Sequence, residues 1–166
     1  MVGRDLLGES GYQEFSMRAV AARCGIGVGT LYNYYSSKQQ LVAAILRSEW
    51  EVHLRRMAQI ARSDRPELDR LTDVFGEVCA FMRGRHSLLI SELPQSMGSD
   101  EIRSALAQRS AVRQQVADML GAILHQRPEE QRQWLADCIA RLFLSYSSYP
   151  EYDAAALHWI LVKLLS

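Results

Sequence analysis

The stretch SMRAVAARCGIGVGTLYNYYSSK, from Ser16 to Lys38, predicts two short helices that are joined by a tight turn. Ser16 can cap the first helix, because its hydroxyl can accept from a backbone N–H two or three residues further along. Gly25 lies where a residue in the left-handed conformation ends a helix at the least steric cost. Two short amphipathic helices around a small glycine-containing turn are typical of a helix-turn-helix.

The second helix is predicted from about Val28 to Tyr35, and the serines and lysine that follow are predicted to end it and to cap a third helix. Leu31 and Tyr35 lie four residues apart and share a face, which we expect to point inward. Ile26 is expected to fill the turn before this helix. The first helix is predicted to have one apolar face, which comprises Met17, Val20, Ala21 and Cys24.

Two other interpretations of this stretch are possible. The second helix could be an ordinary core helix, but neighbouring residues lie about 100° apart around a helix, so Tyr32, Asn33 and Tyr34 cannot share one buried stripe. The three glycines also form a GxGxG pattern, which is found in nucleotide-binding loops. That fingerprint follows a β-strand, and no β-rich run precedes Gly25. We therefore expect an exposed surface that binds another molecule.

The segment GIGVGTLYNYYSSKQQL, residues 25–41, resembles the recognition helix and following segment of TetR-type transcriptional repressors. The upstream pair Gly11-Tyr12 and the long helical pattern after Lys38 also fit this family. The specific resemblance covers roughly residues 2–50, and beyond it only the length and an all-helical pattern match. In this family the first helix is longer and follows a basic arm, whereas here the chain begins almost inside that helix.

The resemblance implies a DNA-binding role for ten residues. Ser16, Met17 and Arg18 lie where the family meets DNA from the supporting helix. Thr30, Tyr32, Tyr34 and Lys38 lie where the family usually meets phosphates. Val28, Gly29 and Asn33, together with Arg18, lie where it can meet base edges.

The composition is that of an ordinary globular protein, with 166 residues, 48% hydrophobic, 23% charged and no formal net charge. Residues 1–56 hold seven Lys and Arg against five Asp and Glu, so the positive excess around the predicted helix-turn-helix is weak. DNA affinity must then come from a few well-placed contacts and from dimerisation. No run approaches the ~18 apolar residues that span a bilayer, and no signal peptide is visible, so we expect a cytoplasmic protein with no membrane partner.

Enzymatic chemistry is not expected. The four histidines lie far apart in the sequence, with no partner at a metal-ligand spacing. No nucleophile elbow, P-loop or H-E-x-x-H motif occurs. We therefore predict no cofactor, no metal and no catalytic residue. Cys24, Cys79 and Cys138 are widely separated and are predicted to be buried free thiols.

We predict an all-α fold of about nine helices, because apolar residues recur at helical spacing throughout and no alternating strand pattern appears. A three-helix helix-turn-helix domain is expected over residues 1–48, and a helical ligand-binding and dimerisation domain over residues 49–166. After the helix-turn-helix, helices are expected over about 38–62, 66–83, 86–93, 99–125, 128–148 and 153–166.

Two further sites are predicted in the second domain. An apolar ligand cavity with a few polar groups is expected to be lined by Trp50, His53, Met57, Phe75, Phe81, Met82 and His86. The last two helices, which also carry Trp159, are apolar around more of their circumference than one buried face requires. A two-fold interface, in which this pair packs on its copy as a four-helix bundle, is therefore favoured over an intramolecular core. Its predicted residues are Trp134, Leu135, Ile139, Leu142, Phe143, Leu157, Ile160, Leu161 and Leu164.

The resemblance implies a ligand-released repressor that acts as a homodimer on a palindromic double-stranded DNA operator, with a small-molecule effector. The alternative is a helical protein–protein adaptor that has kept the fold but not DNA binding. The weak basic charge and the missing arm favour the adaptor, whereas Tyr32 and Lys38 favour the repressor.

Overall fold

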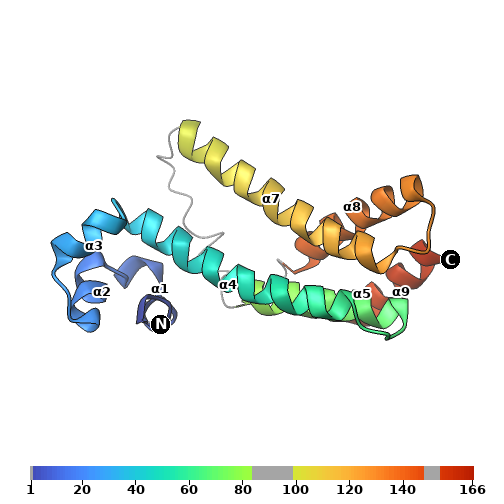
Figure 1. The fold of residues 1–166 in the computed structure, drawn as a ribbon, viewed down its shortest axis with the longest axis horizontal. Coiled ribbons are helices and arrows are strands. Elements are labelled where there is room, and N and C mark those ends of the chain that lie inside the picture. The colour runs from blue at the N-terminus through green and yellow to red at the C-terminus, as the bar shows by residue number, and fades with distance from the viewer. Residues whose placement is uncertain (1, 84–98, 148–153) are drawn as a thin grey trace. The chain divides into compact units, whose positions relative to one another are not determined.

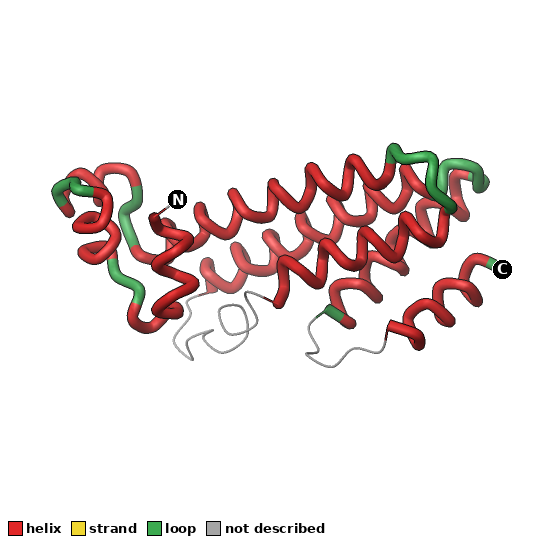
Figure 2. Tube along the Cα trace, turned by 90° about the horizontal axis from the view of Figure 1, so that it is seen from below, coloured by secondary structure: helices red, strands yellow, loops and turns green. Residues whose placement is uncertain are grey.

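The computed structural model describes residues 2–83, 99–147 and 154–166, of which 99–109 and 154 are described by their backbone alone. Every element in these ranges is a helix (Figure 2), so the prediction of an all-α fold is confirmed. Contacts divide the described residues into two compact units, which meet along the sequence between Val52 and His53. The predicted boundary after residue 48 lies a few residues earlier, within the same helix. Within the described ranges, no helix carries an apolar run of the length that a bilayer requires.

The N-terminal unit contains the predicted helix-turn-helix (Figure 1). Its elements are α1 (Val2–Glu14), α2 (Met17–Cys24), α3 (Val28–Tyr34) and the first part of α4 (Lys38–Ala61). The side chains of its core are contributed by all four helices and by the α1–α2 connection: Leu7, Phe15, Met17, Val20, Ala21, Leu31, Leu41 and Val42. The partly buried Tyr12 and Tyr35 pack against the same core.

The caps of the turn are formed as predicted. The Ser16 hydroxyl accepts from the backbone N–H of Ala19 at 3.1 Å. Gly25 adopts φ 67° and ψ 27°, the left-handed conformation. Two backbone bonds then close the helix end: Gly25 N–H to the Ala22 carbonyl at 3.1 Å, and Ile26 N–H to the Ala21 carbonyl at 3.0 Å. This is the Schellman arrangement, which satisfies the last carbonyls of α2 and sets the direction of the chain into α3.

The start of α4 is capped from both directions. The Ser37 hydroxyl accepts from Gln40 N–H at 3.2 Å, and the Gln40 side-chain oxygen accepts from Ser36 N–H at 3.0 Å. Such reciprocal bonds satisfy donors that have no partner inside the helix. The predicted stop and restart at Ser36–Lys38 is therefore confirmed.

The helix α1 bends at Gly11, where φ is 70° and ψ is 176°. This conformation is essentially restricted to glycine. Phe15 N–H bonds to the Gly11 carbonyl at 3.2 Å, so the chain resumes a helical turn directly after the bend. The sequence pattern suggests that the first helix closes at Gly11, whereas in the structure it bends there and a short turn carries Tyr12 and Gln13.

The C-terminal unit contains the rest of α4 with α5 (Glu67–Arg83), α7 (Ser99–Ile123), α8 (Glu129–Tyr146) and α9 (Ala154–Leu165). The helices α7 and α8 approach closely, because a Cβ placed on Gly121 would lie 4.0 Å from the Ala136 Cβ. The largest fully buried side chains of this unit are Met57, Leu71, Val74, Val78, Leu120, Ile123, Leu124, Leu135, Ile139, Phe143, Leu157 and Leu161.

One arginine ties together distant parts of the C-terminal unit. The Arg127 guanidinium, between α7 and α8, donates to a Glu67 carboxylate oxygen at 3.1 Å and to the Leu165 carbonyl at 3.0 Å. The first acceptor lies at the start of α5 and the second at the end of α9. Because the side chain is half-buried, these charge-assisted bonds are less screened than a surface pair would be.

The cysteine prediction is only partly right. Cys79 is buried, and loss of hydration raises the pKa of its thiol to about 11. Cys138 is half-buried, but Cys24 is exposed, so its predicted burial is wrong. Ile26 is also 41% exposed instead of filling the turn. Cys24 is the last residue of α2, and Ile26 lies in the turn that follows it.

The bend at Gly11 yields a test with an internal control. Gly11→Ala forces an L residue into φ 70°, and we expect it to lower the free energy of unfolding by about 1–3 kcal/mol. Gly8→Ala, in the same helix, should raise it by about 0.5–1 kcal/mol. An added Cβ meets nothing within 4 Å at either position, so packing cannot explain the difference.

Urea denaturation followed by circular dichroism measures both variants against the wild type. Changes of the same sign in the two variants would contradict the assigned conformation of Gly11.

Candidate nucleic-acid interface

The helix α3 is held by one buried side chain and presents the rest of its surface to solvent. Leu31 is 6% exposed, whereas Tyr32 is 49% and Tyr34 is 78% exposed. All other residues of α3 are exposed: Val28, Gly29, Thr30 and Asn33. The predicted division into an inward Leu31 and an outward polar and aromatic face is therefore confirmed.

The helix α2 contributes a smaller part of this surface than predicted. Arg18 is exposed, and Ser16 is exposed with its hydroxyl engaged in the helix cap. Met17 is only 5% exposed and belongs to the core of the N-terminal unit. Its predicted contact with DNA is therefore corrected to a packing role, since its side chain faces Val20 and the other core residues.

Lys38, at the first turn of α4, is held by two groups that carry no charge. Its Nζ donates to the Gln13 carbonyl at 3.1 Å. The same nitrogen lies 4.3 Å from the centroid of the Tyr12 ring, within the range of a cation–π contact. The structure thus brings Lys38 to the α1 bend, a contact that the sequence pattern did not reveal.

Some cations of the N-terminal unit are paired with carboxylates and others are not. The Arg23 guanidinium forms two bonds with the Glu9 carboxylate, at 2.7 and 3.2 Å, and this contact raises the pKa of Arg23. Arg4 lies beside Asp5 and holds the pKa of that carboxyl below its ordinary value. Within the described part of the chain, neither Arg18 nor Lys38 is paired with a carboxylate. Their charges remain available to an anionic partner.

The predicted ligand residues lie mostly in packed surroundings. Trp50, Met57 and Phe75 are 5%, 0% and 3% exposed, and Met82 is half-buried. His86 lies outside the described residues. His53 and Phe81 are brought together, because their ring centroids are 5.7 Å apart in an edge-on arrangement.

His53 also contacts a charged group on α5. Its Nδ1 lies 2.6 Å from a Glu77 carboxylate oxygen, and the Arg56 guanidinium lies 3.6 Å from the same oxygen. One predicted ligand residue, His53, therefore forms a part-buried polar pair with Glu77, which was not predicted, next to the ring of Phe81.

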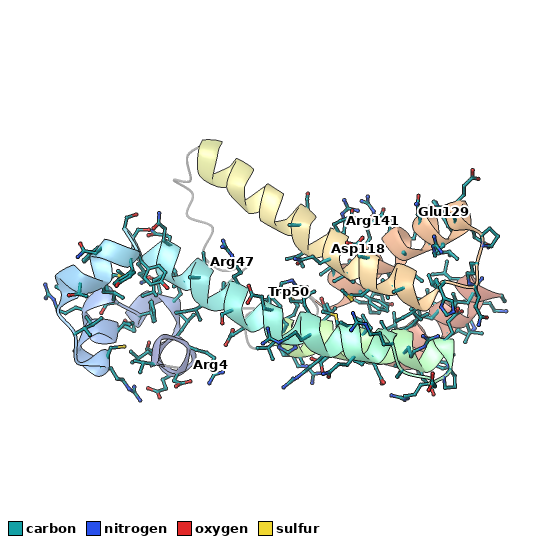
Figure 3. All side chains as sticks on the ribbon, viewed as in Figure 1. Arg4, Arg47, Trp50, Asp118, Glu129 and Arg141 are labelled. Carbon is teal, nitrogen blue, oxygen red and sulfur yellow. The ribbon has the colours of Figure 1, made fainter. Side chains whose placement is uncertain are left out.

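A separate surface groove of about 630 Å³ lies between α7 and α8. Its lining includes the polar Asp118 on α7 and Asp137 on α8, and the small residues Gly121 and Ala136. Figure 3 labels Asp118 on α7, with Glu129 and Arg141 on α8. Arg141 and then Arg113 lower the pKa of Asp137. None of the predicted ligand residues lines this groove, and the small residues at helical spacing on α7 and α8 were the signal that could have indicated it.

The residues predicted for the dimer interface divide by exposure. Five of them belong to the chain's own core, with at most 2% exposed: Leu135, Ile139, Phe143, Leu157 and Leu161. Leu142, Ile160 and Leu164 are half-buried. Trp134 is 61% exposed, and on α9 Trp159 is 62% and Val162 is 40% exposed. Val162 was absent from the predicted set.

Comparison with known proteins places the N-terminal unit in a family. The family model described as bacterial regulatory proteins, tetR family, matches residues 2–45, which extend from α1 into the first turns of α4. The HTH-type transcriptional regulator UidR of Escherichia coli K12 is 36% identical over 56 residues, which are 34% of this chain and 29% of UidR. The chain thus matches less than a third of that relative's length.

Longer matches extend into the C-terminal unit. The HTH-type transcriptional repressor KstR of Mycobacterium tuberculosis is 28% identical over 138 residues, 82% of this chain and 62% of KstR. The crystal structure of FadR from Bacillus subtilis in complex with stearoyl-CoA shares the fold with a TM-score of 0.64 and 17% identity, covering 99% of this chain and 94% of that one. Since these relatives are regulators, they agree with the prediction of a protein that is not an enzyme. Residues 2–45 thus match the N-terminal domain of bacterial regulatory proteins of the tetR family, and the chain shares the all-helical fold of the solved FadR structure.

Proposed function

We propose that this chain is a DNA-binding transcriptional repressor that acts as a homodimer on a palindromic operator and is released by a small molecule. The observation that carries the proposal is the exposure of every residue of α3 except Leu31. A short helix that presents tyrosines, a threonine and an asparagine to solvent matches the recognition helix of a helix-turn-helix, which enters the major groove.

The exposed residues divide by the contacts that their chemistry allows. Hydroxyl groups of Thr30, Tyr32 and Tyr34 and the Lys38 ammonium suit backbone phosphates, which position a protein but carry no sequence information. Asn33 can form a paired hydrogen bond with an adenine edge, and Arg18 can do so with guanine. Val28 offers only apolar contact, for example with a thymine methyl group. Gly29 leaves room for the backbone to approach the DNA.

A homodimer is supported by the surface of the last two helices. Trp134 on α8 and Trp159 with Val162 on α9 are large apolar side chains at the surface of a single chain. Burial of such side chains against a second copy would be favourable. Two copies would also present two α3 helices to the two halves of a palindrome.

The proposed effector is an elongated apolar molecule, and the FadR complex with stearoyl-CoA suggests the acyl-CoA class. The candidate wall residues are apolar, and the His53–Glu77 pair beside Phe81 supplies the polar group that such sites use to orient a ligand. An effector releases DNA only if it binds the DNA-incompetent state more tightly, because equal affinity for both states shifts nothing.

Three substitutions separate phosphate contacts from base contacts. Lys38→Met should weaken all duplexes about equally and reduce the log–log salt slope by about one unit per protomer. Tyr32→Phe should weaken them equally with the slope unchanged, since no charge is lost. Asn33→Ala should cost ~1–3 kcal/mol on the preferred duplex and little on a scrambled one. Fluorescence anisotropy across a salt series measures all three, with a duplex that the wild type selects from a random pool.

Arg55→Met is the matched control, because it removes an exposed positive charge from α4 in the C-terminal unit. It should leave affinity and slope nearly unchanged. If Asn33→Ala and Lys38→Met weaken both duplexes in the same proportion, the assignment of roles is wrong. A wild type that selects no duplex would favour the protein–protein adaptor.

The dimer is tested at its exposed tryptophans. The double variant Trp134→Glu, Trp159→Glu should sediment as a monomer at concentrations where the wild type sediments as a dimer, because a charge in the interface would be buried without a partner. Tyr34→Glu is the control, since it places the same charge on an exposed aromatic position in α3 and should leave the dimer intact. Circular dichroism verifies that all variants stay helical. A monomeric wild type in analytical ultracentrifugation would refute the dimer.

The effector class is tested with stearoyl-CoA, and coenzyme A alone serves as the control. Stearoyl-CoA should raise the melting temperature, since a ligand that binds only the folded state at a hundredfold excess over its dissociation constant contributes about 2.7 kcal/mol. It should also release the protein from its selected duplex, whereas coenzyme A should do neither. If both ligands leave both readouts unchanged, the acyl-CoA class is wrong while DNA binding stands.

A further inference from the structure

The side chain of Lys38 is ordered by groups that leave its charge intact. Its Nζ lies 4.3 Å from the Tyr12 ring centroid and 3.1 Å from the Gln13 carbonyl oxygen. Neither group is a carboxylate, in contrast to the pair of Arg23 with Glu9. The ring and the carbonyl therefore restrain the ammonium, while its full positive charge remains for another anion.

The two restraining groups are themselves fixed by the fold. Tyr12 packs against the core of the N-terminal unit, so its ring is a firm surface for the ammonium. Gln13 lies in the last turn of α1. Backbone carbonyls in the last turn of a helix accept no hydrogen bond from an N–H of the same helix, so a lysine side chain is a favourable donor to them. The bend at Gly11 directly precedes both residues and sets the direction of this turn.

We propose that Tyr12 is a positioning residue that preorganises Lys38 for a DNA backbone phosphate. This inference rests on the proposed DNA-binding function. A lysine side chain has many rotamers, and a side chain that is already ordered loses less conformational entropy on binding. An ammonium has three donors, so one bond to the Gln13 carbonyl leaves donors for a phosphate oxygen. Tyr12 itself need not contact the DNA.

A double-mutant cycle tests this role with a short duplex of random sequence, since phosphate contacts require no operator. Tyr12→Leu removes the face of the ring and should weaken binding about two- to fivefold, the size of an exposed cation–π contact. Tyr12→Phe keeps the face and should bind like the wild type. In a Lys38→Met background, Tyr12→Leu should change the affinity no further.

The salt dependence supplies a readout that a purely structural role of Tyr12 would not change. Tyr12→Leu removes no charge, yet its log–log slope should fall toward that of Lys38→Met, because the lysine is less often at the phosphate. Circular dichroism and thermal melting verify that Tyr12→Leu remains folded at the assay temperature. If Tyr12→Leu is unfolded, Tyr12→Phe alone tests the inference, because it should bind like the wild type.

Three other results would contradict either this inference or the proposed function. If Tyr12→Leu weakens binding equally with Lys38→Met present, Tyr12 acts through the fold and not through Lys38. If Tyr12→Leu strengthens binding, the ring and carbonyl withhold Lys38 from DNA. Either result overturns this inference alone. If the wild type binds no duplex, the proposed function fails, and the inference fails with it.

Discussion

The exposed face of α3 depends on the burial of Leu31. The helix has seven residues, and a helix of that length is not stable in water by itself. Burial of one leucine contributes about 1.5–3 kcal/mol, and Tyr35 packs against the same core directly after the helix ends. The bonds that close α2 at Gly25 fix how the chain enters α3. With the helix held at one position, its other residues are available for contact with a partner.

The features that the sequence predicted well are those in which neighbours along the chain satisfy each other. The hydroxyl of Ser16 and the left-handed Gly25 act within one helical turn, so their effect follows from residue type and spacing. The restart at Ser37 is of the same kind. The long helix from Lys38 was also predicted nearly to its end at Ala61, because its pattern of apolar residues continues without a break. The candidate DNA-binding residues followed from these local elements and from the family resemblance.

The sequence was less informative where a side chain depends on a distant element. Met17 lies both on the predicted apolar face of α2 and among the residues that the resemblance assigns to DNA, and only its burial in the core of the N-terminal unit decides between the two. Ile139 and Trp134 lie on the same apolar helix, yet the first is buried within the chain and the second is exposed. Helical spacing gives the face of a residue but not the molecule that covers it. The hydrogen bond of Lys38 with the Gln13 carbonyl crosses 25 positions of sequence and has no local signal.

The bonds of Arg127 have a consequence for the order in which the protein is made. The guanidinium joins Glu67 near the start of α5 to the carbonyl of Leu165 at the end of α9, so this clamp closes only after Leu165 has left the ribosome. The core of the N-terminal unit, by contrast, is complete once Val42 has emerged. Domains generally fold as units during synthesis, and contacts between distant residues form slowly because a long loop must close first. The nascent chain should therefore acquire its helix-turn-helix while most of the C-terminal unit is still unfinished.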